Sequence, residues 1–210
     1  MKNIISIFLV CLMTTGAFAQ VDRSKQPEPG PAPKINLGEP ETFILKNGLR
    51  VLVVENHKLP RVTASLIIDT KPHSLGDKPA TSTLTGALLG TGTQNMSKDA
   101  FNEEIDFLGA NIGFGSQNAY ASSLSKFFPR IMELMAEGAL KPKFTQTEFD
   151  AEKNKLIEGL KGNEKNVGAI AGRVSSALAY GHNHPYGEFP TVENTEAVTL
   201  PDVQKYYNNY

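Results

Sequence analysis

The sequence predicts an α+β fold in which a mainly antiparallel β-sheet packs against several helices. Residues 42–56 and 61–70 are rich in β-branched and aliphatic side chains, and further strands are predicted within residues 110–125. Between and after these blocks, apolar residues recur at helical spacing. Strands and helices therefore come in runs and do not alternate one by one, which is typical of the α+β class.

The strands begin with a hairpin signal. Asn47-Gly48 separates two β-rich runs, and both residues tolerate the positive φ that a tight hairpin turn requires. Residues 61–70 predict a third strand. Residues 110–116 and 118–125 predict two more, and the first of these is rich in glycine and carries no charge.

Two helices are predicted in the middle of the chain. The first covers residues 80–88, after breaks at Pro72 and Gly76. Its expected buried face consists of Ala80, Leu84, Ala87 and Leu88. Ser97 is the expected N-cap of the second helix, over residues 98–109, which Gly109 ends.

Further helices are predicted toward the C-terminal end. The helix at 127–140 should stop at Lys141-Pro142. It should bury Ile131, Leu134, Met135 and Leu140. Thr147 is the expected cap of a charged helix at 148–166, with a buried stripe of Phe149, Leu156 and Leu160. Two more helices follow, at 167–180 and from Pro201 onward. The last one lacks a stop signal, so we expect a truncated chain.

Residues 1–19 predict a secretory signal peptide. Lys2 provides a basic start, an apolar run too short to span a bilayer follows, and Ala17-Phe18-Ala19 supplies small residues for cleavage. Residues 20–40 form a proline-rich linker, and residues 41–210 form the folded domain. We therefore expect export to the periplasm or to the cell surface of a diderm bacterium.

The composition of the predicted mature chain excludes several classes of partner. Removal of Lys2 leaves 20 of the 21 basic residues against 22 acidic ones, a net charge of −2. This charge gives no reason to expect nucleic acid or an anionic membrane as a partner. The single cysteine, Cys11, lies in the signal peptide, so no disulfide is expected. No second apolar segment is long enough to span a membrane.

Five segments, taken in order, resemble the insulinase/pitrilysin-type zinc metallopeptidases from about Thr42 to Tyr210. They are LKNGLRVLVVEN, GTGTQNMS, DFLGANIGFGSQNAYASSLSKFF, ELMAEGALKPKFTQTEFDAEKNKLIEGLK and HPYGEFPTVENTEAVTLPDVQKYY. The resemblance implies one half-unit of that fold. It also implies an assembly in which two homologous halves enclose the substrate, only one half binds zinc, and peptide is held as an added strand on a sheet edge.

Active members of this family carry H-x-x-E-H on the first helix. The two histidines are zinc ligands on one helical face and the glutamate is the general base. Aligned on GTGTQNMS, these positions fall on Thr83, Gly86 and Ala87. The third ligand of the family, a glutamate, falls on Gly159, seven residues after Glu152. A slip of one residue would place Glu158 there.

The motif positions therefore lack the groups that the chemistry needs. A threonine hydroxyl is a poor zinc donor, and glycine and alanine have no donor in their side chains. The sequence predicts no catalytic residue, no metal and no cofactor, which argues against an enzyme. We expect Thr83, Gly86 and Ala87 to be packing residues of a buried helix, and the long helix to approach it closely at Gly159.

The leading hypothesis is a non-catalytic subunit or half of an exported peptidase assembly, which shapes the chamber and helps to bind peptide. Its expected partner is an active homologous subunit or a second half. Two alternatives stay open: a zinc metalloendopeptidase with ligands such as His182, His184 and Glu188, and a stand-alone envelope binding or scaffold protein. Likewise, the strand at 110–116 could be either a peptide-binding edge or an interior strand.

Overall fold

The computed structural model of the 210-residue chain describes residues 26, 29–32 and 39–210. The predicted signal peptide, residues 1–19, lies outside the described residues. Most of the predicted linker, residues 20–40, also lies outside them. The chain divides into two compact units, with the boundary between Asn56 and His57.

The described core of the first unit is a β-hairpin. Strands β1 (Glu41–Ile44) and β2 (Arg50–Val53) pair antiparallel. The Gly48 N–H donates to the Leu45 carbonyl at 2.9 Å. Gly48 has a φ of +88°, which L side chains rarely adopt. The hairpin predicted around Asn47-Gly48 is therefore confirmed.

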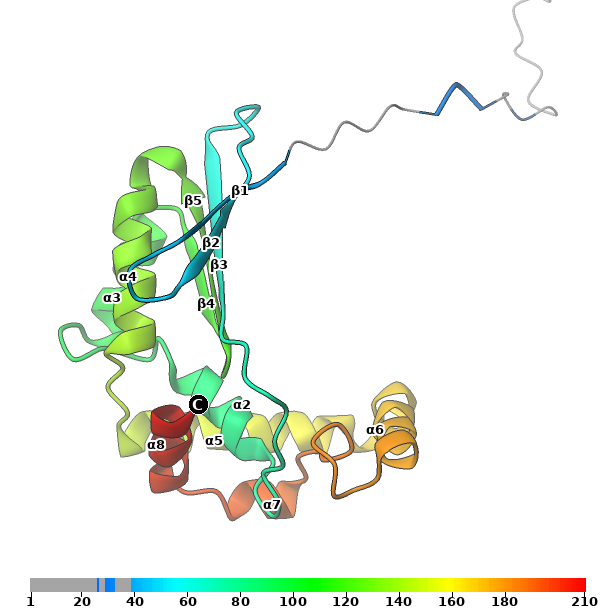
Figure 1. The fold of residues 1–210 in the computed structure, drawn as a ribbon. Helices are drawn as coiled ribbons and strands as arrows, with labels where there is room; N and C mark the ends of the chain where they lie inside the picture. Colours follow the sequence, from blue (N-terminus) through cyan, green and yellow to red (C-terminus); the bar gives the residue numbers. More distant parts are fainter. Residues whose placement is uncertain (1–25, 27–28, 33–38) are drawn as a thin grey trace, which may run out of the picture. The chain divides into compact units, whose positions relative to one another are not determined.

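The second unit contains a three-stranded antiparallel sheet (Figure 1). Its strands are β3 (Arg61–Ile67), β4 (Asn111–Phe114) and β5 (Asn118–Leu124), in the spatial order β3-β5-β4. Exposed and less exposed residues alternate along β3 and β4, as expected for a sheet with one covered face. Among the described strands, β4 pairs only with β5 and so forms an edge of the sheet.

Helices α3 (Lys98–Phe107) and α4 (Phe128–Leu140) cover one face of this sheet (Figure 1). A 3-10 turn (Ser125–Phe127) leads from β5 into α4. The core between helices and sheet consists of Phe101, Ile105, Leu108, Ala110, Ala119, Ala121, Ile131, Leu134 and Met135. Leu140 was predicted to be buried but is 72% exposed. Gly138 holds the buried position in the last turn of α4, and Leu140, two residues later, points away from that face.

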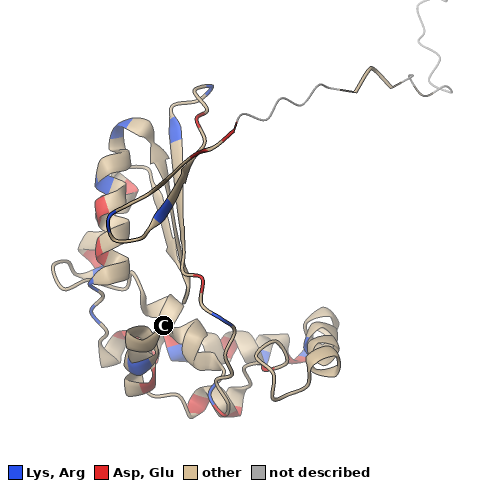
Figure 2. Cartoon of the chain, viewed as in Figure 1, with Lys and Arg blue, Asp and Glu red and all other residues tan. Residues whose placement is uncertain are grey.

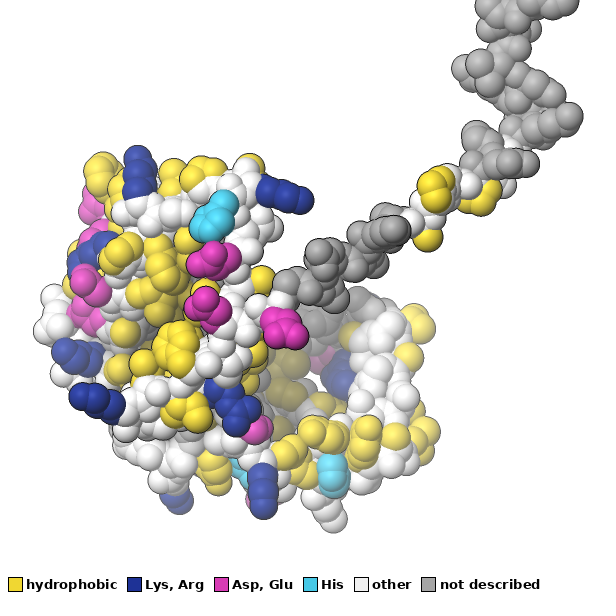
Figure 3. All heavy atoms as spheres, turned by 45° about the horizontal axis from the view of Figure 1, so that its top comes forward, with side chains coloured by type: hydrophobic (Ala, Val, Ile, Leu, Met, Phe, Trp, Pro, Cys, Tyr) yellow, Lys and Arg dark blue, Asp and Glu magenta, His cyan; other side chains and the backbone are white. Residues whose placement is uncertain are grey.

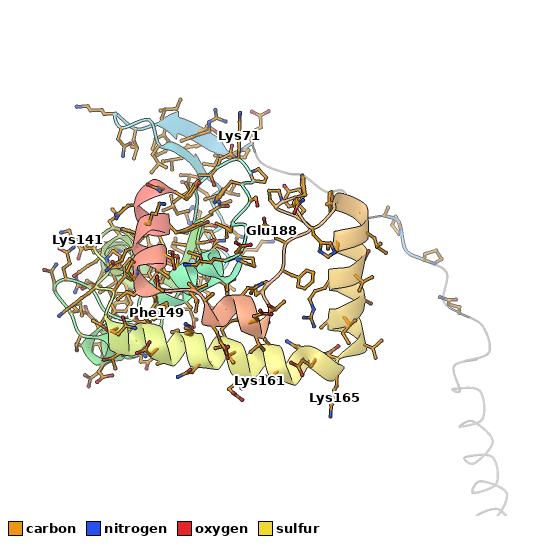
Figure 4. The ribbon with its side chains drawn as sticks, turned by 90° about the horizontal axis from the view of Figure 1, so that it is seen from below. Lys71, Lys141, Phe149, Lys161, Lys165 and Glu188 are labelled. Atoms are coloured by element: carbon orange, nitrogen blue, oxygen red, sulfur yellow. The ribbon has the colours of Figure 1, made fainter. Side chains whose placement is uncertain are left out.

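A second core lies between helices alone. Its elements are α2 (Ala80–Leu88), α5 (Gln146–Gly162), α7 (Val192–Glu196) and α8 (Leu200–Asn209). The buried members are Ala80, Leu84, Leu88, Phe149, Val198 and Val203. Figure 4 shows Phe149 on the side of α5 toward α8 and Lys161 on the other side. The helix α5 is therefore amphipathic, as its sequence indicates.

Several helix boundaries differ from those predicted from the sequence. The Thr145 hydroxyl, not that of Thr147, accepts from the Glu148 N–H, so α5 begins earlier than predicted. The helix α5 ends at Gly162, and a 3-10 turn (Asn163–Lys165) follows. The short helix α7 was not predicted, although Thr191 and Asn194 cap it reciprocally. The caps at Ser97 and the end signal at Gly109, which has a φ of +56°, are confirmed.

The helix α6 (Val167–Tyr180) has no buried residue. Its exposed apolar side chains include Val167, Ile170, Val174 and Leu178. Hydrophobic side chains at the lower right of Figure 3 lie in the region of this helix. None of the helices in the described part of the chain is long and apolar enough to cross a membrane.

Candidate functional site

The helix α2 holds the motif positions Thr83 and Ala87 on its exposed side. These residues are four apart and both are exposed, whereas Leu84 and Leu88 beside them are fully buried. Thr83 and Ala87 were predicted to be packing residues of a buried helix, with Ala87 on its buried face, and for these two residues the prediction is wrong. The buried face extends instead toward Thr85, whose hydroxyl donates to the Thr81 carbonyl at 2.8 Å. That hydrogen bond allows the polar side chain to be buried without an unsatisfied group.

Gly86, at the position of the general base, lies in a different environment. It is buried, and an added Cβ would lie 2.8 Å from the Ser116 nitrogen and 3.0 Å from the Gly115 Cα and carbonyl carbon. These neighbours are backbone atoms of the turn that follows β4, so they cannot move aside as a flexible side chain could. The helix α2 therefore contacts this turn through a residue that must lack a side chain.

The third ligand position, on α5, is open. Gly159 is exposed, and an added Cβ would meet no atom within 4 Å. The expected close helix approach at Gly159 is therefore wrong. The two helices instead pack through larger side chains nearer the N-terminal end of α5, such as Phe149 and Leu156.

The two glutamates near this position are engaged with lysines on the same helix. Glu152 is largely buried and its carboxylate lies 3.5 Å from the Lys155 ammonium. Glu158 is 72% exposed and lies 3.0 Å from Lys161. A one-residue shift of the alignment would therefore select a carboxylate that faces solvent.

The alternative ligand set is not assembled into a metal site. Among the residues that the structure describes, no group of three or more His, Cys, Asp and Glu side chains could hold a metal ion. The His184 ring stacks on Tyr180 with centroids 5.4 Å apart, and its Nδ1 accepts from the Tyr186 N–H at 3.2 Å. The His182 ring lies 6.2 Å from that of Phe189. Both imidazoles are thus exposed parts of an aromatic turn.

Glu188 has a structural role that sequence reasoning missed. Its carboxylate accepts from the Ser74 hydroxyl, from the Leu75 N–H at 2.8 Å and from the Gly76 N–H at 3.2 Å. These donors belong to the loop that leads into α2, beside which Figure 4 places Glu188. Charge-assisted bonds of this kind are stronger than neutral ones. Glu188 therefore fixes the approach to α2.

An ion pair attaches the same loop to α8. The Lys78 ammonium donates to the Asp202 carboxylate at 2.7 Å, and the Thr199 N–H donates to the same oxygen at 2.8 Å. Partial burial alone would raise the pKa of Asp202. The hydrogen bonds from Lys78 and Thr199 outweigh burial and lower this pKa below its usual value.

The edge strand β4 lies next to α2. The Gly115–Ser116 turn against which Gly86 packs directly follows β4 in the chain. Among the described strands, residues 111–114 thus lie at a sheet edge and not in the interior of the sheet. Sheet edges present unpaired backbone donors and acceptors that can bind an extended peptide.

A polar pocket of about 420 Å³ lies beside the loop at 91–97 and the start of α3, and none of the motif positions lines it. The Lys98 ammonium at its wall donates to the Glu148 carboxylate at 2.6 Å. This hydrogen bond is the main reason why the pKa of Lys98 is raised. Because the pair is partly exposed and mutually neutralised, it ties α3 to α5 and offers little charge to a ligand.

The fold and the motif positions define a peptidase-like α+β unit without the zinc motif, and comparisons with known proteins agree. Residues 50–185 match the insulinase family (peptidase family M16). The mitochondrial-processing peptidase subunits beta of Rattus norvegicus and Mus musculus are each 25% identical over 197 residues. Each match covers 90% of this chain but 40% of the relative.

Two solved structures share the fold. A peptidase M16 inactive domain from Pseudomonas fluorescens aligns with a TM-score of 0.71 and 27% identity, over 80% of this chain and 43% of that one. A protease from Helicobacter pylori aligns with a TM-score of 0.70 and 20% identity, over 82% of this chain and 43% of that one. The chain belongs to the insulinase family (peptidase family M16). The resemblance and the fold class predicted from the sequence are confirmed.

Proposed function

We propose that this chain is a non-catalytic subunit or half of an M16-type peptidase assembly, in which it shapes the chamber and helps to bind peptide. The observation that carries the proposal is the contact at Gly86. Backbone atoms fill the space that the side chain of a general base would need. Loss of a general base typically costs a factor of about 10² to 10⁴ in rate, and the exposed Thr83 and Ala87 supply no zinc ligand.

Peptide binding is supported by the position of β4. Its outer edge is unpaired among the described strands, and the turn after it contacts α2. An extended peptide could add to this edge through main-chain hydrogen bonds without any catalytic group. We infer that the part of the site that binds peptide persists where the part that cleaves it has been lost.

The proposed partner is an active homologue or a second half. This chain spans 40% of the curated relatives that it matches and 43% of the solved chains. A similar structure of greater length is an inactive M16 domain. The likeness to an inactive domain of the family supports a role beside an active homologue. We further propose the periplasm or the cell surface as the site of action, on the basis of the signal peptide predicted at residues 1–19.

Purification of the tagged chain from its native cells, followed by mass spectrometry, tests the proposal. The expected result is a stable complex with an M16 protein that carries H-x-x-E-H. The Gly159→Ala variant is a suitable control, because the exposed position should leave the complex intact. A monomer without such a partner would favour the stand-alone scaffold. Stoichiometric zinc together with chelator-sensitive cleavage by the isolated chain would overturn the proposal.

A further inference from the structure

The hydrogen-bonding groups on the free edge of β4 can be assigned. The Gly115 N–H donates to the Asn118 carbonyl at 2.8 Å across the turn. Hydrogen-bonded and non-hydrogen-bonded pairs alternate in an antiparallel ladder, so Gly113 is again bonded to β5. Ile112 and Phe114 therefore direct their N–H and C=O groups toward the free edge. A peptide strand would bond to these two residues, and the peptide residue between those bonds would lie opposite Gly113.

The side chains of β4 point to two different faces. Ile112 and Phe114 pack against the core under α3 and α4. Gly113 belongs to the opposite, outer face, where Tyr120 of β5 is its direct neighbour and Ser65 of β3 follows. Tyr120 is 44% exposed, and an added Cβ at Gly113 would meet no atom within 4 Å. The space between the free edge and the Tyr120 ring is thus open.

The outer face around Tyr120 is neutral. Neither β4 nor β5 contains a charged residue, and Figure 2 shows their ribbons without charged positions. The charged residues nearest to Tyr120 along β3 are Arg61, at the far end of the strand, and Asp69, two residues beyond its other end. A charged peptide side chain would gain no partner here and would lose hydration. An aromatic side chain would pack against the exposed ring of Tyr120.

We propose that Gly113 and Tyr120 form a subsite that selects an aromatic side chain of a peptide bound along β4. The inference rests on the proposed function, because it requires peptide on this edge. In a peptide bound antiparallel to β4, the residue opposite Gly113 lies in a non-hydrogen-bonded pair, in which Cα atoms approach to about 4.5 Å. Its side chain projects over Gly113, which offers no obstacle, and its ring contacts Tyr120. Aromatic pairs of this kind add to affinity beyond simple area burial.

Binding of a short blocked peptide of alternating threonine and valine tests the subsite. One central position is varied among phenylalanine, alanine and glutamate, and affinity is measured by fluorescence anisotropy on the whole chain. The phenylalanine peptide should bind about fivefold more tightly than the alanine peptide. Tyr120→Ala should bring this ratio close to one, whereas Tyr120→Phe should preserve it. Amide chemical shifts of residues 111–114 report whether the peptide occupies this edge.

Two further variants distinguish the preference for an aromatic side chain from the binding of peptide to the edge of β4. Gly113→Val fills the open space but leaves the outward-facing groups of Ile112 and Phe114 free. It should abolish the aromatic preference while the alanine peptide still binds. Ser65→Ala, on the other side of Tyr120, is the matched control and should change nothing. Equal binding of all guest residues, with shifts at residues 111–114, would overturn the subsite and leave the proposed function standing. Absence of any shift there would overturn both.

Discussion

Gly86 on α2 and Gly159 on α5 occupy the two positions where the family resemblance places glutamates, yet their surroundings are opposite. A side chain at Gly86 would collide with the backbone of the Gly115–Ser116 turn. A side chain at Gly159 would point into open space. Packing therefore requires a glycine at position 86 of α2. At position 159 of α5 packing sets no such requirement, and the glycine only means that a ligand side chain is absent.

This difference bears on whether a glutamate could be introduced at each position. At Gly159 a carboxylate could return without changing the fold, because nothing has moved into its place. At Gly86 the turn after β4 lies against the helix, so a glutamate could return only if α2 and the turn separated. Close packing therefore opposes a glutamate at position 86, whereas the open surroundings of position 159 would accept one.

Gly86→Ala is expected to have the largest effect. Overpacking against backbone should cost about 2 kcal/mol or more, and the better helix propensity of alanine recovers only part of this cost. Urea unfolding followed by circular dichroism measures the difference. Unchanged or increased stability would show that the Gly115–Ser116 turn moves aside at little cost. Positions 86 and 159 would then not differ in the way proposed.

Asp202→Ala is expected to rank second, because it releases the loop before α2 from α8. Loss of the bonds from Lys78 and Thr199 should cost about 1 kcal/mol at neutral pH. The pKa of Asp202 is lowered in the folded state, so its contribution is present above the unfolded pKa and is lost as pH falls through the folded value. The penalty should therefore shrink as the pH falls below about 4. A penalty that stays constant in acid would contradict this assignment.

Gly159→Ala should act in the opposite direction from Gly86→Ala. The position is exposed in the interior of α5, so alanine should raise the free energy of unfolding by up to about 1 kcal/mol. The same urea titration measures both variants. If Gly159→Ala destabilised the chain, α5 would have a contact there that the open surroundings do not reveal.

The pair Thr83→His with Ala87→His should have the smallest effect on stability, within about 0.5 kcal/mol, because both sites are exposed. Two histidines at this spacing share one helical face and should bind zinc weakly. Isothermal titration with zinc measures the gain, and a peptidase assay should remain blank because no general base is restored. Strong destabilisation would mean that these positions are packed as tightly as Gly86.

Much of the fold could be predicted because its signals are local. Asn47-Gly48 fixed the hairpin, and Ser97 fixed the start of α3. Local signals compete where similar residues lie close together. Thr145 and Thr147 both resemble helix caps, and only the position of the Glu148 N–H decides between them.

The site was harder to predict than the fold, since burial depends on distant neighbours. Sequence spacing assigned Ala87 to the buried face of α2, but Thr85 occupies that face because a carbonyl accepts its hydroxyl. Gly86 and Gly159 could not be distinguished by sequence, because only three-dimensional packing brings the turn after β4 to one of them. The subsite at Tyr120 depends on strand order, which no local pattern encodes.

The residues that cover the buried face of α2 come late in the chain, so this face stays uncovered during most of synthesis. Leu84 and Leu88 are covered by Phe149, Val198 and Val203, and the preceding loop is held by Glu188. The ribosome must therefore synthesise the chain as far as Val203 before these apolar side chains are fully covered. Until then the nascent chain exposes a hydrophobic segment that a holdase chaperone would recognise.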